Sequence, residues 1–415
     1  MAASAHATAL IVFAIVYATM AVGHLPGLQV DRTGAALVGA LALIATGTID
    51  PQGAWNAIDY RTIGLLFGLM IVSSAFVVSG FYARAAARVA VMPVGPRALL
   101  AVLIGTAAVL SSLLTNDVVV VAMTPLLAAA TLSRGLNPVP FLLGFCFAAN
   151  TGSVATLIGS PQNMIVAQGL HLSFMRFMAV TIVPALISLP IVWSVLVLLY
   201  RNRWRLDPAP QPAASSPSAP VPVNHWETAK AALVALGVIA AFVFTEWPRE
   251  QVALGAAGLL LLNRTIASTD MLKHVDGDLI LLLMGLFVVN AALAQSGLPE
   301  ALLAHLRADG VDLRQPLWLF AVSSALSNIV GNNPAVMLLI PYVAGAAPNA
   351  AGAALALGTG FSSNLLVFGS LAGIIVIGAA AKRGIRIPFG EFSRAGGCVA
   401  LITMAVAAAW IVSLG

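Results

Sequence analysis

Charged residues are scarce in this chain of 415 residues: only 8% are Asp, Glu, Lys or Arg, whereas 60% are hydrophobic. A soluble domain carries about 25% charged residues, so the composition excludes an ordinary soluble protein. Apolar runs of about 20 residues, the length of a helix that crosses a bilayer, recur along the whole sequence. We therefore expect an all-α polytopic membrane protein.

Cysteine is almost absent as well. Cys146 and Cys398 lie apart inside apolar runs, which excludes a disulfide framework and the paired spacing of a metal site. The six histidines are scattered at span edges or in loops, and the glycine-rich stretch at Gly358 lacks the preceding strand and the following lysine of a nucleotide-binding loop. We expect no metal, no cofactor, no catalytic residue and no nucleic-acid partner, and therefore not an enzyme.

The sequence repeats itself at an interval of about 217 residues. The segment that begins at Ile58 matches the one that begins at Val275, and three further pairs of segments match in the same order. A Pro-, Ala- and Ser-rich stretch has the composition of a linker. We expect a first repeat over 1–205, a linker over 206–228 and a second repeat over 229–415.

Each repeat contains a long apolar segment with polar residues at its centre, at 97–131 and at 315–345. We expect each segment to form a re-entrant hairpin whose tip carries the polar residues. Each repeat then crosses the membrane five times, giving about ten spans and two hairpins. Because five is odd, the second repeat is inverted with respect to the first.

The distribution of basic residues predicts the orientation of the chain. With the N-terminus outside, fifteen of the 20 Lys and Arg residues fall in inner loops and five in outer loops, as the positive-inside rule requires. No basic region precedes the first apolar run, so we expect a retained span and not a cleaved signal. The expected location is a bacterial inner membrane, with both termini in the periplasm and the linker in the cytoplasm.

Polar residues at the tips and in two interrupted spans, 139–168 and 353–380, mark the expected substrate site. Backbone leaves a helix inside a bilayer only against protein or a wet cavity, and the N–H groups of helix starts suit oxygen-rich ligands. Some of these side chains could instead join helices to one another. The candidate binding residues carry hydroxyl or amide groups: Thr115, Asn116, Asn150, Thr151, Ser160, Gln162, Asn163, Asn332, Asn333, Ser363, Asn364 and Ser370.

Asp117 is the expected site of proton or sodium coupling, because no other ionisable side chain lies deep within the expected spans. A carboxylate at the bilayer centre costs about 2.5–3.5 kcal/mol, so it is expected to be protonated or paired with a cation. The second tip has the neutral Asn333 at the equivalent position. The alternative is a capping carboxylate that stabilises a hairpin helix by about 1 kcal/mol.

Four stretches resemble the ion transporter superfamily: TNDVVVVAMTPLL, NTGSVATLIGSPQNMIV, SNIVGNNPAVMLLIP and SSNLLVFGSLAGIIV. This superfamily includes ArsB-type arsenite permeases, citrate–metal symporters, NhaD-type sodium/proton antiporters and dicarboxylate carriers. The resemblance implies inverted repeats, a homodimer held by scaffold helices, and elevator-like motion of a transport domain. In some arsenite systems a cytoplasmic ATPase subunit docks on the permease, so such a subunit is a candidate partner.

The tip motifs narrow the expected substrate. Dicarboxylate carriers of this group usually show Ser-Asn-Thr at both motifs, whereas this chain reads Thr-Asn-Asp and Gly-Asn-Asn. The Asn-Asp tip and the FGSLAG segment are more similar to arsenite permeases, and the IGSPQN segment is similar to broader anion permeases. We expect no Arg or Lys near the site, so a fixed carboxylate would repel a dianion by several kcal/mol at an effective dielectric of about 20.

We therefore expect a secondary active transporter that exports arsenite or antimonite in exchange for protons. The first alternatives are a proton- or sodium-coupled permease for citrate, dicarboxylate or sulfate, and a sodium/proton antiporter. An uncoupled, channel-like facilitator is the third reading, and the lone carboxylate and the repeat argue against it.

Overall fold

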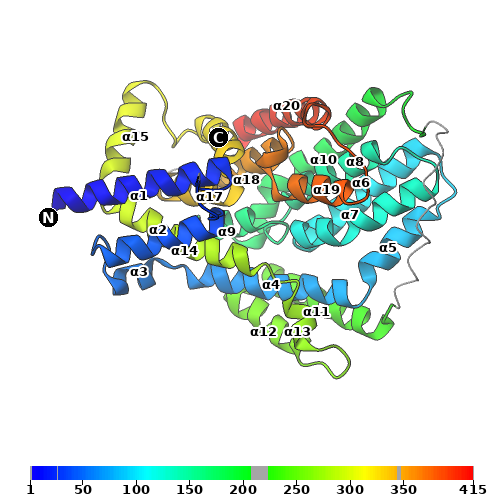
Figure 1. Ribbon diagram of the computed structural model, residues 1–415, viewed down its shortest axis with the longest axis horizontal. Helices are drawn as coiled ribbons and strands as arrows, with labels where there is room; N and C mark the ends of the chain where they lie inside the picture. The colour runs from blue at the N-terminus through cyan, green and yellow to red at the C-terminus, as the bar shows by residue number, and fades with distance from the viewer. Residues whose placement is uncertain (1, 26, 207–222, 344–346, 415) are drawn as a thin grey trace.

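The computed structural model describes residues 2–25, 27–206, 223–343 and 347–414, which form twenty α-helices and two 3₁₀ helices (Figure 1). Seven of these helices are at least 18 residues long and apolar enough to cross a membrane, and four more are apolar but shorter. Over these residues the protein is thus all-helical, with the apolar helices of a polytopic membrane protein, as its composition predicts.

The helices of the two halves follow a similar order of long and short elements, except that α17 is shorter than its counterpart α7. The first half contains α1 (Ala2–Val22), α2 (Arg32–Ala45), α3 (Pro51–Ala57), α4 (Tyr60–Val78), α5 (Phe81–Ala90), α6 (Pro96–Leu113), α7 (Asn116–Ser133), α8 (Pro138–Ser153), α9 (Pro161–Gly169) and α10 (Phe174–Leu199). The second half contains α11 (His225–Phe244), α12 (Arg249–Leu261), α13 (Ser268–Leu272), α14 (Gly277–Ala294), α15 (Leu298–Ala308), α16 (Pro316–Val330), α17 (Asn332–Leu339), η1 (Ile340–Val343), α18 (Pro348–Ser362), η2 (Val367–Gly369), α19 (Leu371–Ala381) and α20 (Phe389–Leu414).

The boundary between the halves differs from the predicted linker at its second end. Most of the linker, 207–222, lies outside the described residues. Helix α11 already begins at His225, inside the predicted linker, because the side chain of Asn224 caps it by accepting a hydrogen bond from the Glu227 amide at 3.2 Å. The short helices α3, α5, α13 and α15 lie outside the hairpin segments and the interrupted spans that the sequence predicted.

Both predicted hairpin segments are interrupted at their polar centres. Helix α6 ends at Leu113 and α7 begins at Asn116, with Thr115 extended between them. Helix α16 ends at Val330 and α17 begins at Asn332, and Gly331 takes a φ of +94°, which a residue with a Cβ adopts only with strain.

The first pair of arms is longer than the sequence suggested. Helices α6 and α7 have 18 residues each, or about 27 Å at 1.5 Å per residue, so each is long enough to cross a membrane. Two crossings and one re-entrant hairpin both return the chain to the side from which it started. The predicted orientation therefore does not depend on which occurs, and the hairpin stays a prediction.

Two close helix crossings are equivalent at the repeat interval. A Cβ on Gly68 of α4 would lie 2.5 Å from the backbone carbon of Ala253 in α12, and a Cβ on Gly285 of α14 would lie 2.7 Å from that of Ala36 in α2. Gly285 follows Gly68 by 217 residues, and Ala253 follows Ala36 by the same interval. Each crossing joins one helix from each half, so α4 packs on α12 as α14 packs on α2.

Helices α8 and α18 lie at the centre of the molecule. Every residue of α8, and every residue of α18 from Ala350 to Ser362, is buried. Helix α6 packs on α8, and α16 packs on α18. Helices α10 and α20 contact each other and α18, with α20 near the top in Figure 1. The segments that follow α8 and α18 are therefore held inside the protein.

Candidate substrate site

The two central helices end in the middle of the protein, and short segments connect them to the next helices. Helix α8 ends at Ser153 and α9 begins at Pro161, with Pro at its first position after Ser160. Helix α18 ends at Ser362 and α19 begins at Leu371, where the Ser370 hydroxyl accepts the Gly373 amide at 3.0 Å. Each half thus provides a helix start inside the protein, as Ser-Pro and Ser-Leu sequences favour.

Each tip is tied to the interrupted helix of its own half. The backbone N–H of Asn116 donates to the Gly159 carbonyl at 2.9 Å. In the second half the Asn332 side-chain amide donates to the Ser363 hydroxyl at 2.9 Å. These bonds fix the tips against the segments that precede α9 and α19.

A buried hydrogen-bond network joins the two halves behind the tips. The Asn150 amide donates to the Asn364 carbonyl oxygen at 3.0 Å and to the Ser370 hydroxyl at 3.1 Å. The Asn364 amide donates to the Thr151 hydroxyl at 3.3 Å. All four side chains are buried, and polar groups that are buried and paired in this way rigidify the elements that carry them.

A cavity of about 300 Å³ lies where both tips meet both interrupted helices. Helices α1, α2 and α14 close its other side with Met20, Thr33 and Leu282. Six predicted binding or coupling residues line it: Asn116, Asp117, Gln162, Asn332, Asn333 and Ser370.

The other predicted binding residues are absent from the lining and lie behind it: Thr115, Asn150, Thr151, Ser160, Asn163, Ser363 and Asn364. Several of them have partners in the protein. The Thr115 hydroxyl donates to the Ser73 hydroxyl at 3.0 Å, and the Asn163 amide donates to the carbonyls of Ser153 and Thr156 at 2.8 and 3.0 Å. In this structure these residues support the site instead of facing it.

Asp117 is the second residue of α7 and faces the cavity. Its carboxylate takes part in no hydrogen bond or ion pair with the described residues, and α7 has no side-chain cap. The capping role considered as the alternative therefore has no support in the geometry. An unpaired carboxylate open to a cavity is free to bind a proton, a cation or a hydroxylated solute.

Three further charged residues line the same cavity, so the expectation of no basic residue near the site is wrong. They are Arg32 at the start of α2, Asp276 at the N-cap of α14, and Asp278 in its first turn. The sequence placed them at span edges, and the cavity extends to those edges. Burial lowers the pKa of His274, which lies just before α14.

One signal in the sequence pointed to this edge. Asp276 matches Asp59 in the repeat, and both cap equivalent helices: Asp276 accepts the Leu279 amide, and Asp59 accepts the Arg61 and Thr62 amides. The repeat therefore pointed to Asp276, but its role as a helix cap did not indicate that it also lines the cavity.

Comparisons with known proteins agree with this architecture. The sequence profile described as "Citrate transporter" matches residues 9–373. The 46 kDa membrane protein of Mycobacterium leprae is 28% identical over 423 residues, which cover 97% of each chain. The silicon efflux transporter LSI3 of Oryza sativa subsp. japonica is 34% identical over 163 residues, 39% of this chain and 33% of LSI3.

A solved structure shares the fold over the full length. The crystal structure of the Alcanivorax borkumensis YdaH transporter covers 99% of this chain and 98% of its own, with a TM-score of 0.57 and 15% identity. At this identity the likeness concerns the fold alone. The profile covers most of the chain, and the resemblance inferred from the four sequence stretches is confirmed. The chain therefore belongs to the citrate transporter family of the ion transporter superfamily and is an integral membrane transporter.

Proposed function

We propose that the protein is a proton-coupled secondary transporter that exports small, neutral, hydroxylated metalloid acids, with arsenous and antimonous acid as the first candidates. The observation that carries this proposal is the lining of the central cavity. Amide and hydroxyl groups from both tips and both interrupted helices surround it, together with three carboxylates and one guanidinium.

The balance of charge favours a neutral solute. Three carboxylates against one guanidinium repel a multivalent anion, by several kcal/mol at an effective dielectric of about 20. A neutral hydroxylated acid offers donors and acceptors that match the side-chain amides of Asn116, Gln162 and Asn332. The relative LSI3 is named for the efflux of silicon, another metalloid.

Coupling is assigned to Asp117, whose carboxylate has no partner among the described residues and faces the cavity. Protonation of this group as substrate leaves, and release of the proton to the cytoplasm, would link efflux to the proton gradient. The neutral Asn333 at the second tip lines the same cavity and cannot titrate, so the second tip offers no equivalent coupling site.

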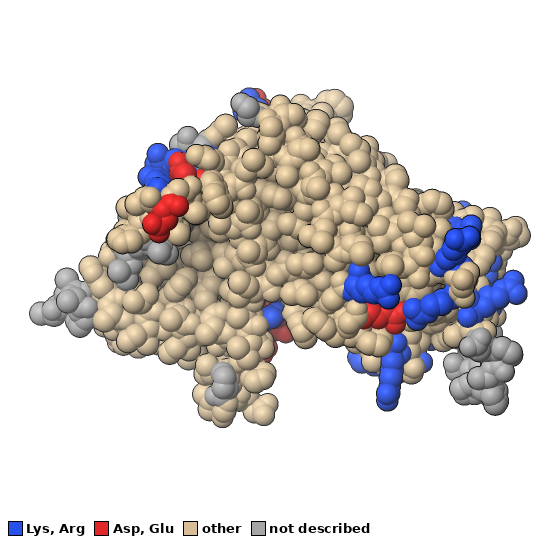
Figure 2. Space-filling model, turned by 90° about the horizontal axis from the view of Figure 1, so that it is seen from above, with Lys and Arg blue, Asp and Glu red and all other residues tan. Residues whose placement is uncertain are grey.

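The proposal places the protein in a bacterial inner membrane, with the linker in the cytoplasm and both termini in the periplasm. Figure 2 supports this orientation, because Lys and Arg gather at the end where Figure 1 places α5. The equivalent crossings of α4 on α12 and of α14 on α2 support the inverted repeat. The homodimer, the elevator motion and the cytoplasmic ATPase partner rest on the family resemblance.

A second candidate is a carboxylate substrate such as citrate. Arg32 favours it, because a guanidinium in the cavity lining offers two parallel donors to a carboxylate. The profile that matches the chain is also named for citrate. Replacement of Arg32 by Gln separates the candidates in a binding assay, since it should abolish the binding of citrate, whereas the binding of a neutral metalloid acid needs no cation.

The test is transport into everted vesicles or proteoliposomes under an imposed pH gradient, with arsenite, antimonite, citrate, sulfate and sodium compared at equal protein. Proton-dependent accumulation of arsenite or antimonite supports the proposal. Accumulation of citrate alone selects the second candidate, and equilibration of any solute without dependence on the gradient contradicts the coupling.

A further inference from the structure

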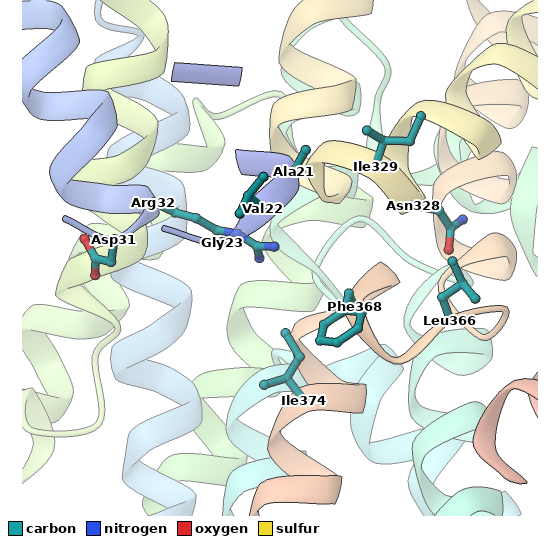
Figure 3. Close-up of a pocket in the computed structure, with 10 residues that line it drawn as sticks. All are labelled: Ala21, Val22, Gly23, Asp31, Arg32, Asn328, Ile329, Leu366, Phe368 and Ile374. Carbon is teal, nitrogen blue, oxygen red and sulfur yellow. The ribbon is translucent and has the colours of Figure 1, made fainter. Parts of the chain in front are cut away.

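Arg32 lies between the central cavity and a second one. This second cavity, of about 560 Å³, lies between the end of α1 and the helices α16 and α19, and Arg32 and Phe368 line both cavities. Figure 3 shows the Arg32 guanidinium pointing away from α2, past Gly23, toward the space beside Phe368. The side chain donates no hydrogen bond to a described residue, and its Nε is buried without a partner. The guanidinium is therefore unattached in this conformation.

Arg249 is the counterpart of Arg32 in the other half, and its side chain is hydrogen-bonded to the protein. Each is the first residue of its helix, α2 or α12, and Arg249 follows Arg32 by 217 residues. The same interval relates the two glycine crossings through which these helices pack. The Arg249 Nη2 donates to the backbone carbonyl of Leu172 at 2.6 Å. Leu172 is buried in the turn between α9 and α10.

The second half offers an acceptor equivalent to the Leu172 carbonyl. Ile387 lies two residues before Phe389, where α20 begins, as Leu172 lies two residues before Phe174, where α10 begins. Both residues are buried. The sequence around them also repeats, with GLHLSF in the first half and GIRIPF in the second.

We propose that Arg32 and Arg249 are alternating latches: in the opposite conformation Arg32 donates to the Ile387 carbonyl, and Arg249 is released into a cavity. Two equivalent halves that exchange conformations also exchange their contacts. The hydrogen bond of Arg249 and the unbonded guanidinium of Arg32 are the two arrangements that the halves would exchange. This inference rests on one part of the proposed function, namely alternating access, and it does not depend on which substrate is transported.

The latches can be tested by crosslinking in protein that lacks Cys146 and Cys398. The reagent is a bifunctional thiol compound whose span matches an arginine side chain. The control pair is Lys230 and Leu262. Lys230 donates to the Leu262 carbonyl at 3.0 Å, so this pair, like each latch pair, consists of a basic residue and the residue whose carbonyl it reaches. That contact joins α11 to α12. The equivalent helices of the first half, α1 and α2, also pack on each other, so we expect the contact to be the same in both conformations. The three cysteine pairs are Arg249→Cys with Leu172→Cys, Arg32→Cys with Ile387→Cys, and Lys230→Cys with Leu262→Cys.

We expect both latch pairs to crosslink, and conditions that raise the yield of one to lower that of the other while the control stays constant. Arg249→Gln should raise the yield of the Arg32–Ile387 pair by about tenfold, the shift expected when one charged hydrogen bond is lost from one state. A cysteine variant that transports and yet never crosslinks at that pair overturns the proposal. So does a variant with all four cysteines in which both crosslinks form in one molecule.

The two proposals fail in different ways, because crosslinking needs no substrate. Mutually exclusive crosslinks without metalloid flux would refute the proposed substrate and leave the latches standing. Metalloid flux without the Arg32–Ile387 crosslink would refute the latches and leave the proposed function standing.

Discussion

At the scale of single residues, the site separates groups that face the cavity from groups that hold it in shape. Asp117 and Asn333 face it, whereas Asn150 and Asn364 join the two halves behind it. The sequence could propose all four, because each is a polar residue in an apolar segment. It could not separate residues that face the cavity from residues that support it, because that depends on which side chains form hydrogen bonds with neighbouring helices.

Replacement of Asp117 by Asn should leave a folded, membrane-inserted protein and abolish proton-driven accumulation. Asn already stands at the equivalent position of the other tip, so the fold tolerates an amide there. Asp117→Glu should retain partial activity with a shifted pH profile, because the carboxyl group still titrates at a new position. The measurement is flux into proteoliposomes with and without a pH step. Full coupled transport by the Asn variant would remove Asp117 from the mechanism.

Asn150→Ala should lower stability by about 1–3 kcal/mol, because it leaves the Asn364 oxygen buried without its donor. Asn333→Ala is the matched control. Its side-chain oxygen is buried without a partner, so the variant should unfold at nearly the wild-type temperature and lose substrate binding. Thermal unfolding in detergent, together with a binding assay, compares the two. Equal destabilisation by both variants would contradict the division between supporting and facing residues.

At the scale of helices, apolar runs and internal repeats carry most of the information. The breaks at Thr115 and Gly331 follow from polar residues in the middle of apolar segments, and the structure interrupts the helices there. The length of α6 and α7 could not be read in the same way, because the pattern does not say where an arm ends in the bilayer. Arg32 and Asp276 were missed for a related reason. Their role depends on how far the cavity reaches toward the helix ends.

The paired crossings predict equal effects of equivalent substitutions. Gly68→Ala and Gly285→Ala each place a Cβ within 3 Å of the facing backbone, and such overpacking costs about 1–3 kcal/mol. Gly255→Ala, in α12 and with nothing within 4 Å of its Cβ, should be neutral or slightly stabilising because Ala favours helix. Thermal unfolding in detergent measures all three. A loss at Gly68 without a similar loss at Gly285 would argue against equivalence of the two crossings.

At the scale of the whole molecule, the orientation in the membrane depends on the sum of many weak preferences. Arg and Lys gather at one end (Figure 2), and no single residue decides the outcome. The sequence could supply this count, whereas the depth of the tips in the bilayer needs a membrane to define it.

A cysteine at position 216, in the linker outside the described residues, tests the orientation. In protein without Cys398, which is exposed, Ser216→Cys should react with an impermeant thiol reagent in everted vesicles and stay unreactive in intact cells with a permeabilised outer membrane. Labelling from the periplasmic side would place the linker outside and reverse the proposed topology. A cysteine at Ser4, near the N-terminus, serves as the opposite control.

The two glycine crossings also bear on how the protein is made. Because α4 packs on α12 and α2 packs on α14, the half that leaves the ribosome first has two close helix-packing surfaces without partners until the second half is inserted. Neither half is then a stable product by itself. A gene split in the linker should yield transport when both pieces are co-expressed, whereas each piece alone should be degraded. Pulse-chase lifetimes of the pieces, apart and together, would reveal this mutual dependence during biosynthesis.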